Sequence, residues 1–145
     1  MTGDERRDGS IARLDPITGF ADHGALAMAA PPAIASATRA GLMISIGVIT
    51  LADADDAPAR DRSVSLALRA SVRATDQLFR LDENRVVVLM PMTDTRGVSK
   101  VMLRVARLCD RPFAWGAATA PTDGTEIHAL LGRACSPERA EYLSF

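Results

Sequence analysis

The sequence predicts a single α+β domain in which helices cover a mostly antiparallel sheet. Three observations predict this class. An uninterrupted apolar run over 42–49, rich in β-branched residues, is typical of a central strand that is buried on both faces. The apolar stretches 77–81 and 86–90 flank the polar connection 82–85, and this pattern predicts a β-hairpin. Apolar side chains recur at helical spacing over 98–108, so an amphipathic helix is expected after the hairpin.

The elements before the hairpin follow from local composition. The segment 15–20 combines Pro and Gly and predicts a turn. The alanine-rich segment 21–30 predicts a short helix, which we expect the two prolines at 31–32 to end. The residues 53–62 are polar and acidic and predict a loop, and the helix after it is expected to end near Ala74.

The hairpin and the elements after it complete the order helix, strand, helix, hairpin, helix, strand, helix. Asn84 tolerates positive φ and is expected to close the hairpin, whose second strand ends at Pro91. A strand over 113–119, a turn over 120–124 and a helix over 126–134 follow.

Composition narrows the function classes. A chain of 145 residues suits one domain, with residues 1–12 as a polar tail and 13–145 as the domain. The net charge of −1 argues against general nucleic-acid binding. No apolar run reaches the roughly 20 residues of a membrane helix, so we expect a cytoplasmic protein without membrane insertion. Cys109 and Cys135 are expected to be reduced packing residues. All basic residues except Lys100 are arginine, a bias that is either genomic or functional.

Four segments, in order, resemble the GGDEF domain of diguanylate cyclases between about residues 13 and 134. The segment 15–20 resembles the family's Asp-x-Leu-Thr-Gly-Leu turn, and 80–91 resembles its Arg-Tyr-Gly-Gly-Asp-Glu-Phe hairpin without a gap. Thr93 and the helix that follows suit the next part of the family, and 115–124 is similar to its Ser-Ile-Gly-Val-Ala segment and the Pro-x-Asp-Gly after it. The resemblance implies a ferredoxin-like βαββαβ core in a bacterial signalling domain.

The positions that the family uses for catalysis differ in this chain. Its metal-binding carboxylates on the first strand match Ser45 and Gly47. In the signature turn, the two glycines match Asp82 and Glu83, and the acidic pair matches Asn84 and Arg85. A shifted register, with Asp82 and Glu83 as the acidic pair, needs two compensating gaps and misplaces one face of the hairpin.

Two further family features have no counterpart. The guanine-recognising stretch after the first strand is missing over 52–61, and Cys135–Glu138 breaks the last helix where the family places a phosphate-contacting lysine. We therefore predict a degenerate GGDEF domain with no catalytic residue, metal or cofactor.

One family site is matched. Arg73 and Asp76 stand five residues before the hairpin connection, at the spacing of the family's inhibitory Arg-x-x-Asp site for cyclic di-GMP. Arginine pairs with guanine O6 and N7, and a carboxylate accepts from guanine N1–H and the amino group. Arg69 or Arg80 is expected to add a contact. The alternative is that Arg73 and Asp76 form a local ion pair at the end of a helix.

Other chemistry-bearing residues have structural interpretations. His23 and His128 are expected on the surface, Trp115 in the core, and Ser45 in the core with its hydroxyl bonded to its own backbone. A basic stretch of four arginines is expected to form a solvated face. Its members are Arg60, Arg62, Arg69 and Arg73.

Three hypotheses follow from these patterns. The first is an inactive receptor that binds cyclic di-GMP through Arg73 and Asp76 and regulates a protein partner. The second is a protein-interaction domain that binds no nucleotide. The third is a relic cyclase that uses Asp82 and Glu83, or a GTP-binding regulator. The first two require an unidentified protein partner, and a homo-oligomer is left open.

Overall fold

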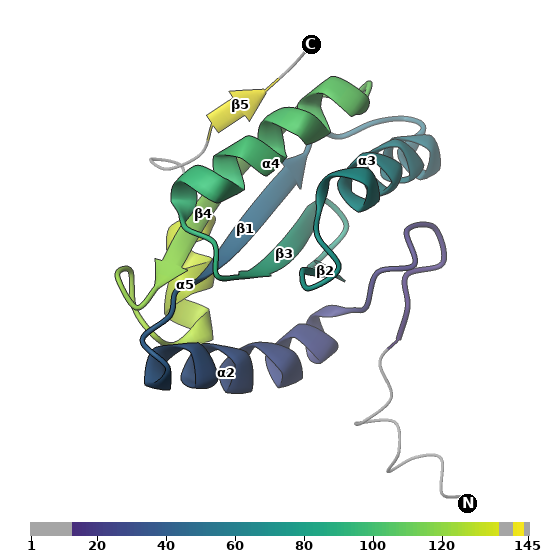
Figure 1. Ribbon diagram of the computed structural model, residues 1–145. Helices are drawn as coiled ribbons and strands as arrows, with labels where there is room; N and C mark the ends of the chain where they lie inside the picture. Colours follow the sequence, from purple (N-terminus) through teal and green to yellow (C-terminus); the bar gives the residue numbers. More distant parts are fainter. Residues whose placement is uncertain (1–12, 137–140, 144–145) are drawn as a thin grey trace, which may run out of the picture.

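A computed structural model describes residues 13–136 and 141–143 (Figure 1). Its strands form one five-stranded sheet in the order β2-β3-β1-β4-β5, in which all neighbours are antiparallel. The elements in chain order are α2 (His23–Arg39), β1 (Ile44–Leu51), α3 (Ala57–Ser71), β2 (Gln77–Arg80), β3 (Arg85–Pro91), α4 (Thr95–Leu108), β4 (Phe113–Ala120), α5 (Ile127–Ala134) and β5 (Glu141–Leu143). The succession β1-α3-β2-β3-α4-β4 confirms the predicted α+β class with a βαββαβ core.

The sheet separates two apolar cores. Strand β1 is central, as predicted, and its side chains alternate between the faces. Ile49 and Leu51 pack with α3 and α4, whereas Ile46 and Val48 pack with α2 and α5. Figure 1 shows α3 and α4 on one side of the sheet and α2 on the other. Trp115 lies in the first of these cores, as predicted.

Helix α2 corrects one prediction, because it continues through Pro31 and Pro32 and ends at Arg39. A proline inside a helix leaves the carbonyl four residues earlier without its usual donor. Both prolines, and the residues at 27 and 28 that lose these donors, are exposed, so water can replace the missing bonds. The buried face of α2 runs past the prolines to Ile34 and holds the helix on the sheet.

Helix α3 begins earlier than predicted. Asp56 accepts a hydrogen bond from the Ala59 amide and caps the helix, and Pro58 lies in its first turn. The segment predicted as a loop therefore contributes most of its length to α3, which ends at Ser71 and not near Ala74. The hairpin is confirmed, but Asn84 does not take positive φ, since Met92 is the one described non-glycine residue that does.

Strand β5 was not predicted, and the predicted tail over 1–12 lies outside the described residues. No helix in the described ranges is long and apolar enough to cross a membrane.

Candidate functional site

The turn before α2 is organised by one carboxylate. Asp15 accepts hydrogen bonds at Oδ2 from the amide and hydroxyl of Thr18, both at 2.8 Å, and from the Ile17 amide at 3.2 Å. Gly19 follows with φ +75°, a conformation that favours glycine. These bonds turn the chain so that Phe20 enters the core and is 2% exposed. The turn thereby lies against the end of α3.

Arg69, in the last turn of α3, contacts this turn. Its guanidinium lies 4.9 Å from the centroid of the Phe20 ring, within the range of a cation–π interaction. Its Nη2 also donates to the Thr18 carbonyl at 2.7 Å. A Cβ added at Gly19 would lie 3.0 Å from the same nitrogen, so the close approach of Arg69 favours glycine there. Arg69 is therefore held by two contacts.

Asp76 shapes the connection between α3 and β2. Its Oδ2 accepts from the Arg73 amide at 2.8 Å and lies 3.8 Å from Arg73 Nε. The Asp76 side chain is fully buried, and its Oδ1 finds no hydrogen-bond donor among the described residues. A buried carboxylate oxygen without a donor is costly, so the connection between α3 and β2 leaves one hydrogen-bond acceptor unsatisfied.

These residues line one cavity of about 410 Å³. Gly19 and Phe20 form one wall, Arg69 contributes from α3, and Arg73 and Asp76 contribute from the connection to β2. The structure thus brings together three of the four residues predicted for ligand binding. Two are cations and one is a carboxylate.

Arg73 also has protein partners. Its side chain is 57% exposed, and its Nη2 donates to the Pro91 carbonyl at 3.0 Å and to the Thr93 hydroxyl. The guanidinium therefore reaches from the cavity to the end of β3. The predicted local ion pair between Arg73 and Asp76 is present as well. The structure is therefore compatible with both interpretations of these two residues, a ligand site and a local ion pair.

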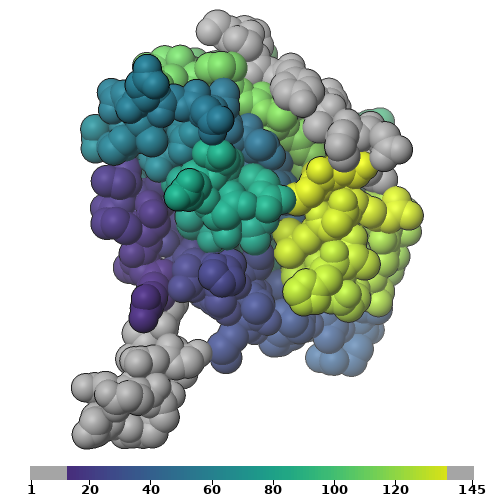
Figure 2. Space-filling model, turned by 180° about the vertical axis from the view of Figure 1, so that it is seen from behind, coloured from purple at the N-terminus to yellow at the C-terminus, as the bar shows by residue number. Residues whose placement is uncertain are grey.

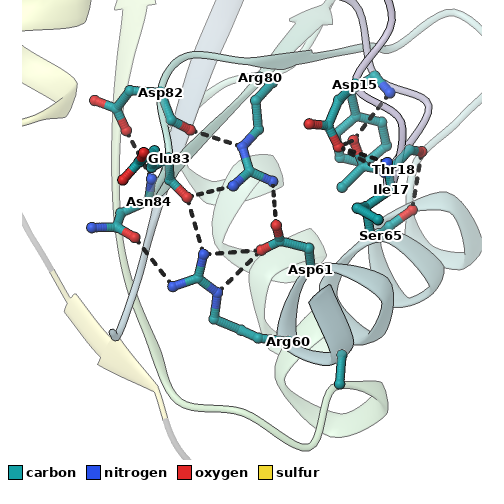
Figure 3. Close-up of polar contacts among 12 residues, drawn as sticks. Asp15, Ile17, Thr18, Arg60, Asp61, Ser65, Arg80, Asp82, Glu83 and Asn84 are labelled. Atoms are coloured by element: carbon teal, nitrogen blue, oxygen red, sulfur yellow. Dashed lines mark hydrogen bonds and ion pairs between the residues drawn. The ribbon is translucent and has the colours of Figure 1, made fainter. Parts of the chain in front are cut away.

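Arg80, the fourth predicted residue, belongs to a different cluster (Figure 3). Its Nη1 lies 3.0 Å from Asp61 Oδ2, and its Nε donates to the Asp82 carbonyl at 2.8 Å. Arg60 donates to Asp61 Oδ1 through Nε at 3.1 Å and to the Glu83 carbonyl through Nη2 at 3.0 Å. We call Arg60, Asp61 and Arg80 the buried ion triad.

The triad corrects the prediction of a solvated arginine face for one member, Arg60. Arg60 is 4% exposed, and Arg62 and Arg69 are the exposed members of that stretch on α3. Pairing with Asp61 and with backbone carbonyls makes this burial tolerable. The sequence signal that was missed is the Asp56 cap, which starts α3 early enough to turn Arg60 inward.

No protein-family model matches the sequence, and no curated protein matches it significantly. Solved structures do match. The FimX GGDEF domain of Pseudomonas aeruginosa has a TM-score of 0.75 at 12% identity, with 86% of this chain and 90% of that chain covered. The GGDEF domain of DgcB from Caulobacter crescentus, in complex with c-di-GMP, has a TM-score of 0.70 at 15% identity, covering 86% and 88%. The chain has the fold of a GGDEF domain.

A third similar structure is the diguanylate cyclase SiaD of Pseudomonas aeruginosa in complex with its activator SiaC. Its TM-score is 0.69 at 16% identity, with 90% of this chain and 58% of that chain covered. These likenesses establish the GGDEF fold of the chain.

The hairpin turn 82–85 is closed by its own side chains. Asp82 Oδ2 pairs with Arg85 Nη2 at 2.6 Å, and Asp82 Oδ1 accepts from the Asn84 amide at 3.0 Å. Partial burial alone would raise the pKa of Asp82, but the hydrogen bonds and charge of Arg85 lower it below its ordinary value. The hydrogen bonds that Arg85 donates to Asp82 raise the pKa of Arg85. Figure 2 shows this hairpin (teal-green) between the N-terminal segment (purple) and α5 (yellow).

The first strand meets this turn at its C-terminal end. The Leu51 amide donates to the Asn84 carbonyl, and the Asn84 amide group donates to Asp53 at 3.1 Å. Ser45 pairs with Met90, away from the turn, and its hydroxyl contacts the Thr93 carbonyl and the Thr119 hydroxyl. The Ser45 hydroxyl therefore bonds to other segments and not to its own backbone. Ser45 and Gly47, matched above to the family's metal carboxylates, do not lie beside the turn.

The remaining candidates lie where they were expected. His23 and His128 are exposed, and Cys109 and Cys135 are free thiols. Within the ranges that the structure describes, no group of three or more His, Cys, Asp or Glu side chains is arranged to hold a metal ion.

Asp15 makes the turn pH-dependent. Partial burial alone would raise its pKa, but hydrogen bonds from Thr18 and Ile17 and the charge of Arg80 lower it below 3.8. Such a carboxylate stabilises the fold above its unfolded pKa, and this contribution is lost as pH falls through the lower folded pKa. We expect the free energy of unfolding in urea to fall between about pH 5 and pH 3, and to fall less in Asp15→Asn. Identical pH profiles for the two proteins would contradict this role.

Proposed function

We propose that this domain is a catalytically inactive receptor for cyclic di-GMP, which it binds through Arg73, Asp76 and Arg69, and that binding regulates a protein partner. The observation that carries the proposal is the unpartnered, buried Oδ1 of Asp76 at a cavity lined by two guanidinium groups. A GGDEF structure of similar fold, that of DgcB, contains c-di-GMP.

The chemistry of the cavity fits a guanine base linked to phosphate. The Asp76 carboxylate, once turned toward the cavity, would accept from guanine N1–H and the amino group, and an arginine fork matches the O6 and N7 acceptors. The second guanidinium would pair with a phosphate oxygen through the donors that its protein partners leave unused. A cavity of about 410 Å³ holds one base and part of the backbone, so the rest of the ligand would remain exposed. Arg80 is excluded from this proposal, because the buried ion triad occupies its guanidinium.

Two features support inactivity. Asp82, Glu83, Asn84 and Arg85 stand at the degenerate signature turn, where side chains replace the space that glycines leave for a nucleotide. The Asp82 carboxylate is also paired with the Arg85 guanidinium, so it is not available to hold a divalent cation. The proposal therefore assigns no catalytic residue and no metal.

A second candidate function is that of a nucleotide-independent interaction domain. The observation in its favour is that the Arg73 guanidinium already bonds to Pro91 and Thr93 without a ligand. Binding of cyclic di-GMP would have to compete with these bonds.

Titration calorimetry separates the candidates. The receptor is expected to bind cyclic di-GMP with a Kd of about 10 µM and to give no comparable heat with GTP and Mg²⁺. Incubation with GTP and Mg²⁺ is expected to yield no cyclic dinucleotide. Absence of cyclic di-GMP binding would refute the receptor and favour the nucleotide-independent interaction domain. Turnover of GTP that is lost in Glu83→Ala would show that the domain is a relic cyclase.

A further inference from the structure

A second cavity, of about 360 Å³, lies between the end of β3 and the helix α4. We call it the methionine groove, because Met43, Met90 and Met92 line it together with Arg73, Lys100 and Arg104. Met43 is 43% exposed and Met92 is 67% exposed. Methionine is flexible and polarisable, and it is over-used at surfaces that adapt to partner side chains. The groove is therefore suited to an apolar anchor of variable shape.

The rim of the groove is positively charged. Arg73, Lys100 and Arg104 face one carboxylate, that of Asp94, which is already used to accept from the Gly97 amide at the start of α4. Arg104 donates to the Ser71 carbonyl at 2.9 Å, so its guanidinium is fixed beside the groove. An apolar groove with a cationic rim is complementary to a segment that combines apolar and acidic side chains.

The backbone of the groove is strained. Met92 has φ +52°, a left-handed conformation that costs free energy in a residue with a side chain. Its amide donates to the Met43 carbonyl at 2.9 Å, which holds the conformation, yet its side chain lies mostly in solvent and contributes little burial. Strain kept at a mostly exposed apolar residue is typical of functional surfaces.

We propose that the methionine groove docks an acidic, amphipathic segment of the protein partner, with an apolar side chain of that segment seated against Met43 and Met92. This inference names the docking surface of the proposed receptor, and it rests on the proposed function only where it concerns coupling to cyclic di-GMP.

The coupling follows from Arg73, which lines both cavities. In the free protein its guanidinium bonds to Pro91 and Thr93, next to Met92. A ligand that draws Arg73 toward Asp76 removes one cation from the rim of the groove and adds phosphate charge nearby. Cyclic di-GMP and the acidic segment therefore weaken each other's binding, to the same extent by thermodynamic linkage.

Methyl NMR of methionine-labelled protein tests the docking surface. The probe is a short peptide in which leucines recur at helical spacing among glutamates. We expect it to shift the methyl signals of Met43 and Met92 with a Kd of about 100 µM, and to leave Met28, which is 62% exposed on α2, unchanged. Lack of shifts at Met43 and Met92, or equal shifts at Met28, would overturn the proposal.

Variants and altered peptides sharpen this test. Lys100→Glu is expected to weaken the peptide about tenfold, whereas Arg107→Glu, on the same helix but outside the groove, leaves it unchanged. Peptides with lysine for glutamate or serine for leucine are expected not to bind. Equal losses in the two variants, or binding of the serine peptide, would reduce the effect to general charge attraction and contradict a docking groove.

The last measurement is the peptide affinity in the presence of cyclic di-GMP. It is expected to weaken the peptide about fivefold in the wild type and to have no effect in Arg73→Ala. Peptide binding in a protein that never binds cyclic di-GMP would refute the proposed receptor and keep the groove. Cyclic di-GMP binding without peptide binding would refute the docking groove and keep the proposed receptor. Binding of both ligands without a mutual effect would refute the coupling.

Discussion

Replacement of Asp61 by alanine is expected to lower the free energy of unfolding by about 3 kcal/mol, because it leaves two buried guanidinium groups without their shared carboxylate. The side chains of Arg60, Asp61 and Arg80 are 4%, 10% and 13% exposed. Removal of one partner from a buried ion cluster costs more than the cluster itself contributes, since the remaining charges stay desolvated. Backbone carbonyls at Ala52 and Glu83 retain part of the compensation for Arg60.

Urea denaturation of Asp61→Ala measures this effect. The matched control is Asp110→Ala, whose carboxylate pairs with Arg111 on the surface at 78% exposure and is expected to contribute less than about 1 kcal/mol. A loss in Asp61→Ala no larger than that in the control would contradict the role of the triad. The triad also contacts the carbonyls of the hairpin turn, so we expect hydrogen exchange at Asn84 to accelerate in Asp61→Ala.

Replacement of Phe20 by alanine is expected to destabilise the fold by about 3 kcal/mol and also to weaken cyclic di-GMP binding. Phe20 is 2% exposed, so its removal leaves a cavity in the core against α3. The Arg69 guanidinium lies 4.9 Å from the centroid of the Phe20 ring. Without the ring, Arg69 keeps only its hydrogen bond to the Thr18 carbonyl to hold it at the cavity.

The control for Phe20→Ala is Leu26→Ala, on the other face of the sheet. Leu26 is equally buried, and its loss is expected to cost about 3 kcal/mol without changing the affinity for cyclic di-GMP. The two variants therefore separate a general loss of stability from a change at the cavity. Equal affinities for cyclic di-GMP in the two variants would show that Phe20 does not position Arg69.

Much of the fold could be predicted from the sequence because its strands carry an unambiguous pattern. The apolar run 42–49 overlaps β1 and is compatible with a strand alone, and the patterns of the β2–β3 hairpin and of helix α4 are equally specific. The sequence predicts each of these elements within a few residues. Apart from the missed strand β5 and the φ of Asn84, the errors in the predicted fold concern helix ends. Pro31 and Pro32 are compatible with α2 because they fall on its exposed face, which tertiary packing and not local composition decides.

The candidate site also depends on tertiary contacts that local sequence does not reveal. The spacing of Arg73 and Asp76 was visible in the sequence, but their cavity also needs the turn of Gly19 and Phe20, which comes from a distant part of the chain. Arg80 was predicted with them because it is near in sequence, yet its strand directs it toward Asp61. The burial of Arg60 and the groove formed by Met43 and Met92 depend on contacts between segments, for which the sequence offers no periodic signal.

The most direct test of the receptor is calorimetric titration of cyclic di-GMP into the wild type, Arg73→Ala and Arg39→Ala. Arg39 is an exposed arginine at the end of α2, outside the cavity, and serves as the matched control. We expect binding at about 10 µM in the wild type and in Arg39→Ala, and a loss of tenfold or more in Arg73→Ala. Binding that survives Arg73→Ala, or no binding in the wild type at about 100 µM ligand, would contradict the proposed site.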